Sequence, residues 1–261
     1  MNFSSVLLLF FVCNFFISCS SQSQSRSEEL YSGHATKTPV SHQAYSELLQ
    51  KYVSTQGKVN YKEFLKDSVA LNQYLQTLSN NPPAETWSRA EQLAYWINAY
   101  NGFTLQLILR NYPLKSIKDI GSKIKIPFVN TPWDEKFIRI GQSRIDLNEI
   151  EHSILRQKFN EPRIHFAIVC ASVSCPPLLN RAYTASDLNQ QLNKQAHLFI
   201  NDPSRNKIKP NQIQISKIFS WFKGDFTKKE SLIGFLNKYS RVKINPDAQV
   251  STLDYNWNLN E

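Results

Sequence analysis

The sequence predicts an α+β fold: a mainly helical single domain with a small mixed or antiparallel sheet. Three observations support this prediction. Most of the chain repeats apolar residues with helical spacing, and only a few short runs have the composition of strands. The apolar content of 41% in 261 residues is enough for one sizeable core.

The first 19 residues, MNFSSVLLLFFVCNFFISC, carry no charged side chain. Their apolar stretch has the length of a signal-peptide core and is too short to span a bilayer. Its end, Ile17-Ser18-Cys19, resembles a bacterial lipobox. Residues 1–19 are therefore expected to be a lipoprotein-type signal peptide, with Cys19 lipidated and holding the protein at a membrane. An ordinary secretory signal is the alternative, because the segment lacks Lys and Arg before its apolar core.

Export limits which anionic partners the positive net charge of the protein could attract. The formal net charge is +9, which by itself favours an anionic partner. A protein anchored outside the cytoplasm, at the cell envelope, has no access to nucleic acid, so that partner is excluded. The charge then either attracts the chain to anionic surfaces or reflects an ordinary solvated surface.

The globular domain is expected at 41–261, after a Ser- and Gln-rich flexible tether at 20–40. A first helix is predicted at Gln43–Tyr52. Helical spacing continues from Tyr61 and again over Val69–Leu78, until Asn80, Asn81, Pro82 and Pro83 end it.

A long helix is predicted over Arg89–Arg110. Ser88 and Glu91 have capping-box spacing at its start. Glu91, Asn98 and Asn101 lie within about 80° of one another on the helical wheel. On a helix that is otherwise so apolar, this polar stripe is expected to face protein or a pocket.

The later elements follow the same signals. The segment 164–170 is rich in Ile and Val and is predicted to be a central strand. The other expected elements are a short helix near Ile117, a hairpin around Gly141-Gln142, a helix over Leu147–Phe159, a helix over Asp187–Ile200, a short strand in QIQISKIFSWF that passes into a helix, and a last helix over Leu232–Tyr239.

The run RIHFAIVCASVSCPPL contains the chemistry-bearing residues. Cys170 and Cys175 are the cysteines left beyond the signal peptide. They fit a buried core, a disulfide or a reactive thiol. A disulfide needs Cα atoms about 4.4–6.8 Å apart, so the chain between them must turn tightly. A zinc site with His152 and His165 is chemically feasible, but the spacing is weakly diagnostic, and no metal or cofactor is assigned.

Thiol catalysis is the sharper hypothesis. Strand alternation separates His165 from Cys170, whereas Cys175 lies beyond the turn and can fold back toward His165. Cys175 is then the nucleophile and His165 the general base, with His152 as a second base. Asn98 or Asn101 would orient the reacting groups or bind the oxyanion, with Glu91 supporting them.

Aromatic residues also stand beside carboxylates or amides in three short stretches. They are Trp133-Asp134, Trp221-Phe222-Lys223-Gly224-Asp225 and Tyr255-Asn256-Trp257. Carbohydrate-contacting surfaces have this composition, and so does ordinary aromatic packing with a hydrogen-bonded rim.

Together these residues resemble the DUF547 family, a domain of unknown function found in bacterial exported proteins and in plant proteins. The segments that carry the resemblance are EQLAYWINAYNGFTLQLIL, YPLKSI, PWDEKFIRIGQSRIDLNEIEHSILR, PRIHFAIVCASVSCPPL, ISKIFSWFKGDF and DYNWNLNE. They cover about residues 45–261 in the family's order. The matched polar positions are Glu91, Asn98, Asn101, His152, His165, Cys170 and Cys175. The resemblance implies no established activity.

Two hypotheses of function follow. The first is an extracytoplasmic lipoprotein that acts as a thiol-dependent hydrolase or acyl transferase. The second is a non-catalytic envelope module that binds a glycan or a protein, with Cys170 and Cys175 structural or disulfide-bonded.

Overall fold

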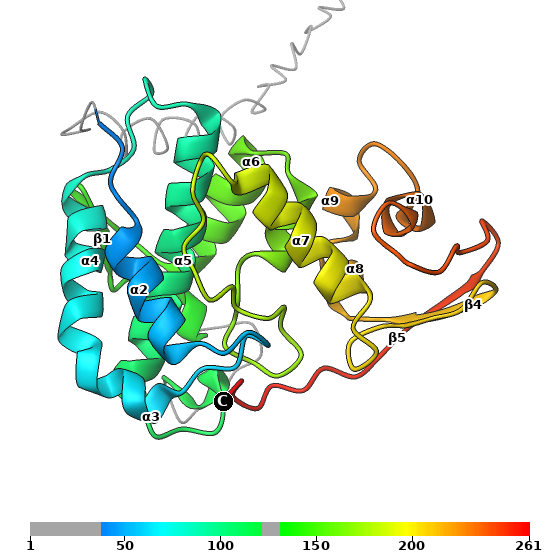
Figure 1. The fold of residues 1–261 in the computed structure, drawn as a ribbon, viewed down its shortest axis with the longest axis horizontal. Helices are drawn as coiled ribbons and strands as arrows, with labels where there is room; N and C mark the ends of the chain where they lie inside the picture. Colours follow the sequence, from blue (N-terminus) through cyan, green and yellow to red (C-terminus); the bar gives the residue numbers. More distant parts are fainter. Residues whose placement is uncertain (1–37, 122–130) are drawn as a thin grey trace, which may run out of the picture.

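The computed structural model describes residues 38–121 and 131–261. The expected signal peptide, its Cys19 and most of the tether lie outside the described residues. A larger helical body and a smaller lobe make up the described part, and one helix runs along both (Figure 1). Within that part, no helix has the length and apolar character needed to cross a membrane.

The helical body is formed mainly by the described residues that precede residue 188. Its elements are α2 (Gln43–Tyr52), α3 (Tyr61–Phe64), η1 (Leu65–Asp67), α4 (Ser68–Asn80), α5 (Arg89–Asn111), η2 (Ile117–Asp119), η3 (Pro132–Asp134), β1 (Ile138–Ile140), β2 (Ser143–Ile145), η4 (Glu149–Leu155), α6 (Arg156–Lys158) and η5 (Pro162–Phe166). Strands β1 and β2 form the predicted antiparallel hairpin.

Helix α5 is the central element of this body. Its capping box is confirmed: the Glu91 amide donates to Ser88 Oγ at 3.2 Å, and the Ser88 amide donates to Glu91 Oε2 at 2.6 Å. Every residue from Leu93 to Leu109 is buried. The helix therefore holds its polar side chains inside protein, where each needs a partner.

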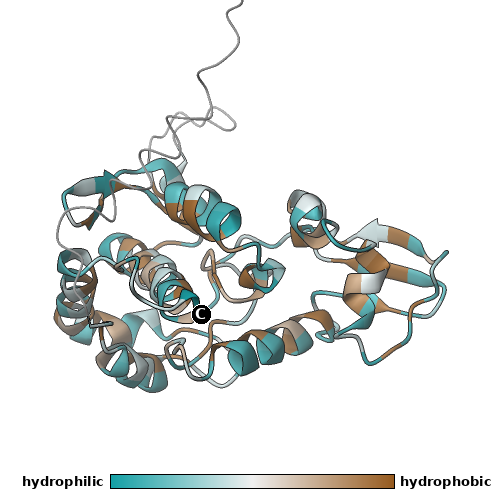
Figure 2. Cartoon of the chain, turned by 90° about the horizontal axis from the view of Figure 1, so that it is seen from above, coloured by the Kyte–Doolittle hydropathy of each residue, from teal (hydrophilic) through white to brown (hydrophobic). Residues whose placement is uncertain are grey.

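The smaller lobe follows helix α7 (Leu188–Ile200) and has its own apolar cluster. Five phenylalanine rings pack together there: Phe166, Phe199, Phe219, Phe226 and Phe235. Around them lie β3 (Lys207–Ile208), β4 (Gln212–Ile215), α8 (Ile218–Trp221), α9 (Lys223–Phe226), α10 (Leu232–Asn237) and β5 (Gln249–Thr252). Figure 2 colours the apolar residues brown, and most of those on the helices belong to one of the two buried clusters.

The sheet of this lobe is mixed, because β4 pairs antiparallel with β3 and parallel with β5. With the β1–β2 hairpin this confirms the predicted α+β fold with a small mixed or antiparallel sheet.

The C-terminal segment returns from β5 to the helical body (red in Figure 1). Leu259 pairs with Ser172, and its amide donates to the Lys115 carbonyl at 2.8 Å. The Asn260 carbonyl accepts from the Val59 amide at 2.9 Å. This return carries Tyr255 and Trp257 back to the junction between the two lobes.

The predicted central strand at 164–170 is wrong. Residues Pro162–Phe166 form a 3₁₀-helix, and the chain then continues as an irregular buried segment. A short buried apolar run has no periodicity that distinguishes a strand from other buried backbone, and here Ile164 and Phe166 enter different apolar clusters. The helix expected at Leu147–Phe159 is present, but Glu149–Leu155 winds as a π-helix.

Replacing Gly57 by Ala is expected to lower the free energy of unfolding by about 2 kcal/mol. Gly57 has φ +78°, and an added Cβ would lie 2.5 Å from Pro177 Cβ, just after the cysteine segment. Urea denaturation measures the change. Gly224→Ala in α9 is the control, because its Cβ would meet nothing within 4 Å. Equal midpoints for the two variants would contradict the expected clash.

Candidate functional site

A pocket of about 170 Å³ lies where the two lobes meet. Its aromatic side is formed by Trp133, Trp221, Phe222, Tyr255 and Trp257. Its polar side chains are Tyr100, Asn148, Glu151, His152 and His165, and both cysteines also line it. Residues from α5, η3, η4, η5, α8 and the C-terminal segment therefore converge on one space.

The aromatic side is a cluster of rings set at different angles. Trp221 and Trp257 are stacked at 5.8 Å between ring centroids, and Tyr255 lies within 5 Å of both. Trp133 meets Trp257 edge-on at 5.9 Å. Trp221 remains 47% exposed, so its ring is available to a ligand.

Asp225 of α9 anchors the polar side. Its Oδ2 accepts from His165 Nε2 at 2.7 Å and from Arg156 Nε at 2.6 Å, and its Oδ1 accepts from Arg156 Nη2 at 3.2 Å. Burial by itself would raise the pKa of Asp225, but the hydrogen bonds from His165 and Arg156 hold the pKa well below its usual range. Asp225 is therefore ionised and acts only as an acceptor.

The partners of the two histidines fix their tautomers. Since the Asp225 carboxylate only accepts, His165 must carry its proton on Nε2. Arg156 Nη1 lies 3.1 Å from His152 Nδ1 and only donates, so His152 must carry its proton on Nε2 as well. Burial lowers the pKa of both rings, and the Arg156 charge lowers that of His152 further. Both histidines are thus neutral near pH 7.

Phe222 holds these groups in place. The His165 ring stacks on Phe222 at 4.0 Å between centroids, and the Arg156 guanidinium lies over the same ring at 5.0 Å. The aromatic contact and the Asp225 bonds together leave the His165 ring little freedom to rotate.

Glu151 is the second carboxyl group of the site, and its environment differs from that of Asp225. It is 8% exposed, and Tyr100 Oη donates to its Oε2 at 3.0 Å. Burial raises the pKa of Glu151 to about 7, against the opposing effects of Tyr100 and Arg156. It lies on the π-helix, a conformation found frequently at functional sites.

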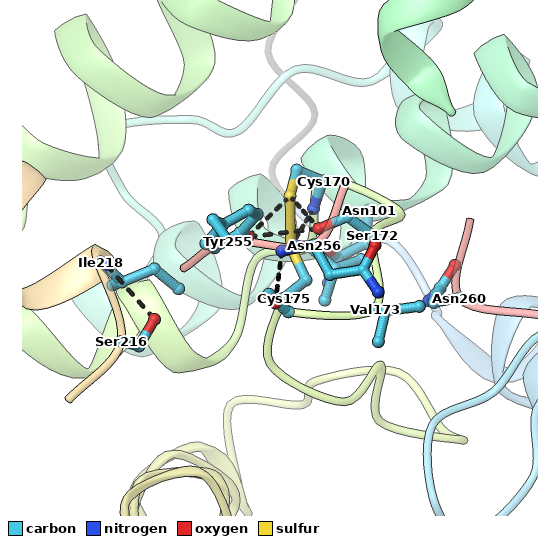
Figure 3. The surroundings of a disulfide bond; sticks show 12 residues. Asn101, Cys170, Ser172, Val173, Cys175, Ser216, Ile218, Tyr255, Asn256 and Asn260 are labelled. Atoms are coloured by element: carbon cyan, nitrogen blue, oxygen red, sulfur yellow. Dashed lines mark hydrogen bonds between the residues drawn. A yellow bond between two sulfur atoms is a disulfide. The ribbon is translucent and has the colours of Figure 1, made fainter. Parts of the chain in front are cut away.

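Cys170 and Cys175 form a disulfide with a Cα–Cα distance of 6.2 Å. Figure 3 shows Tyr255 and Ser172 beside it, with Tyr255 Oη 3.3 Å from Cys170 Sγ. The turn between the cysteines includes Ala171 at φ +57°, a value that costs a non-glycine residue about 1–2 kcal/mol. Such strained backbone is typical of functional sites.

The structure brings four of the predicted site residues together. His152, His165, Cys170 and Cys175 all line the pocket. The zinc interpretation does not match their arrangement, because the sulfur atoms bind each other. Among the described residues, no group of three or more His, Cys, Asp or Glu side chains could hold a metal ion.

The polar stripe of α5 does not line this pocket. Asn98 binds the amide and the carbonyl of Tyr183, at 2.9 and 2.8 Å. Asn101 donates to the Ala167 carbonyl and accepts from the Val169 amide, both at 2.9 Å. Glu91 caps the helix. The Asn98 and Asn101 side chains thus bind backbone groups of segments without regular secondary structure. Asn101 thereby fixes the position of the segment that leads to Cys170.

Sequence reasoning missed five polar residues of the site: Tyr100, Asn148, Glu151, Arg156 and Asp225. Glu151 directly precedes a predicted site residue, and Asp225 belongs to the WFKGD stretch already associated with site walls. No pattern in the sequence predicts the π-helix that places both Glu151 and His152 at the pocket.

Comparison with known proteins supports the family resemblance. Residues 84–200 match the model of DUF547, described as a protein family of unknown function. No curated protein sequence and no solved structure matches the chain. The matched segment includes η4, η5 and both cysteines, whereas the aromatic stretches from α8 and the C-terminal segment lie beyond it.

Glu151→Gln is expected to stabilise the protein at pH 8 by about 2 kcal/mol and to have little effect at pH 5. The folded state raises the pKa of Glu151 from 4.5 to about 7, so it keeps a proton that the unfolded chain releases. Wild-type stability is therefore lost as pH rises through this range, while the amide has no proton to release.

Thermal unfolding of both proteins at the two pH values measures this difference. Glu135→Gln removes an exposed carboxylate outside the pocket and serves as the control. A gain in Tm that is the same at pH 5 and pH 8 would show that Glu151 is not held protonated.

Proposed function

We propose that the protein is an extracytoplasmic binding protein whose pocket takes one sugar unit of a glycan. The observation that carries this proposal is the cluster of four aromatic side chains, Trp133, Trp221, Tyr255 and Trp257, which line the same pocket as its polar side chains. The C–H faces of a sugar ring are apolar and pack on aromatic rings, whose faces are electron-rich.

The polar side chains of the pocket supply hydrogen-bonding groups for sugar hydroxyls. Asn148, Glu151 and His152 all come from the first part of the helix that contains η4, and they provide both donors and acceptors. Ligand sites typically combine such apolar lining with a few convergent polar groups. A volume of about 170 Å³ suits one ring with the rest of a glycan outside.

Export and lipid anchoring belong to the same proposal. The disulfide supports it, because such bonds persist in oxidising compartments. Lipidation of Cys19 at the cell envelope is inferred from the lipobox-like sequence, with residues 20–40 as the tether.

Thiol-dependent hydrolysis or acyl transfer is the second candidate. One observation favours it: Cys175, Cys170 and His165 line the same pocket. Both sulfur atoms are engaged in the disulfide, so the nucleophilic thiolate requires prior reduction.

Alkylation with iodoacetamide distinguishes the disulfide-bonded cysteines from free thiols. The native protein is expected to leave both cysteines of the tryptic peptide 164–181 unmodified, and dithiothreitol is expected to make both reactive, as measured by mass spectrometry. Thiol catalysis demands an activity that appears on reduction and disappears in Cys175→Ser. Modification without reductant would contradict the disulfide-bonded resting state.

Trp221→Ala is expected to weaken sugar binding about tenfold, a loss of about 1.4 kcal/mol, because an exposed stacking face is removed. Isothermal titration calorimetry with chitotriose, cellotriose and maltotriose measures the affinity. Leu198→Ala removes an exposed apolar side chain outside the pocket and should leave the affinity unchanged. The proposal fails if none of the three sugars binds the wild-type protein.

A further inference from the structure

We propose that this pocket is also the active site of an esterase, with Glu151 as general base and His152 as hydrogen-bond donor to the carbonyl oxygen. The inference rests on the proposed function for its substrate class, which is an O-acylated carbohydrate. It uses neither cysteine.

The first step of the argument is the free part of Glu151. Among the described residues, the hydrogen bond from Tyr100 to Oε2 is the only one made to this carboxyl group. Oε1 is left for a water molecule or a ligand in the pocket. Since Tyr100 also fixes the orientation of the carboxyl group, the base is positioned before any ligand arrives.

The raised pKa of Glu151, about 7, suits this role. A base whose pKa is near the working pH is ionised often enough to accept a proton, and it returns that proton readily.

The second step is the state of His152. Because Arg156 donates to Nδ1, the ring keeps its proton on Nε2, and no described residue accepts from Nε2. Arg156 is itself fixed by its two bonds to Asp225. Asp225, Arg156 and His152 thus form a chain of bonds that holds a neutral N–H donor at the pocket, suited to a developing oxyanion.

The third step identifies which bond of the substrate is hydrolysed. Hydrolysis of a glycosidic bond generally employs two carboxyl groups on either side of it. Among the described residues that line the pocket, Glu151 has the only carboxyl group, and both oxygens of the nearby Asp225 are already bonded. One base and one neutral donor match ester hydrolysis, in which water attacks a carbonyl carbon.

The reaction balances without an external reactant other than water. The water oxygen bonds to the carbonyl carbon, and its proton moves to Glu151. The oxyanion that forms accepts a hydrogen bond from His152 Nε2–H. The bond between the carbonyl carbon and the sugar oxygen then breaks, and the proton on Glu151 passes to that oxygen. The products are a carboxylic acid and a sugar hydroxyl.

The test measures hydrolysis of 4-nitrophenyl acetate and acetate release from glucose pentaacetate by the purified full chain. Glu151→Gln is expected to lower kcat/KM by about 10²- to 10⁴-fold for both esters. His152→Phe is expected to lower kcat with little change in KM, because the donor acts on the transition state. Glu135→Gln is the control and should retain the wild-type rate.

The pH profile adds a readout that a structural role would not move. The wild-type rate should rise with pH to a plateau above about pH 7, where Glu151 is ionised, and this rise should be absent from the residual rate of Glu151→Gln. The titratable and charged groups that influence Glu151 from neighbouring elements are Tyr100, Arg156, Asp225 and Tyr255.

The two proposals fail separately. Sugar binding without Glu151-dependent hydrolysis of either ester would overturn the esterase and leave the binding function. Glu151-dependent hydrolysis of 4-nitrophenyl acetate alone, with no sugar bound and no acetate released from glucose pentaacetate, would support the esterase chemistry and overturn carbohydrate as its substrate class. Glu151→Gln is suited to this test because it relieves a buried carboxylate and is expected to fold.

Discussion

The Asp225 carboxylate is the interaction on which the site depends. It comes from α9 of the smaller lobe and binds Arg156 and His165, which belong to the helical body. These bonds connect the two lobes beside the pocket and fix the proton positions on both histidines. Removing one partner would leave a partly buried charge unpaired, so the three groups act as a unit. The pocket therefore has its shape and its pattern of donors and acceptors before a ligand binds.

Buried amides perform a related task deeper in the body. Asn98 and Asn101 each bind both a backbone carbonyl and a backbone amide of segments that lack regular secondary structure. A buried backbone group without a partner costs about 1–3 kcal/mol. These side chains offset that cost, so the backbone near the site can be buried without regular secondary structure. The long helix α5 thus contributes to function by holding the cysteine segment rather than by presenting groups to a ligand, Tyr100 excepted.

Much of the fold could be predicted from sequence because local signals agreed with the final structure. The periodicity of α2, α5 and α7, the capping box of α5 and the turn of the β1–β2 hairpin depend on neighbouring residues. The strand predicted over 164–170 is wrong because this segment bonds to Asn101, which is 66 residues from Ala167 and 68 from Val169. The site was predictable in part: the His and Cys residues drew attention by type, whereas Glu151 and Asp225 matter through burial and partners that only the folded chain supplies.

The contrast between the two carboxyl groups explains why this pocket suits chemistry as well as binding. Asp225 receives three hydrogen bonds from two basic side chains and stays ionised, so it can hold donors but cannot exchange protons near neutral pH. Glu151 receives one bond from a neutral phenol and is buried, so it can gain and lose a proton near neutral pH. Different environments shift the pKa values of two neighbouring acids in opposite directions. One acid can then position other groups while the other transfers a proton. The cost of this arrangement is a buried carboxylate above pH 7.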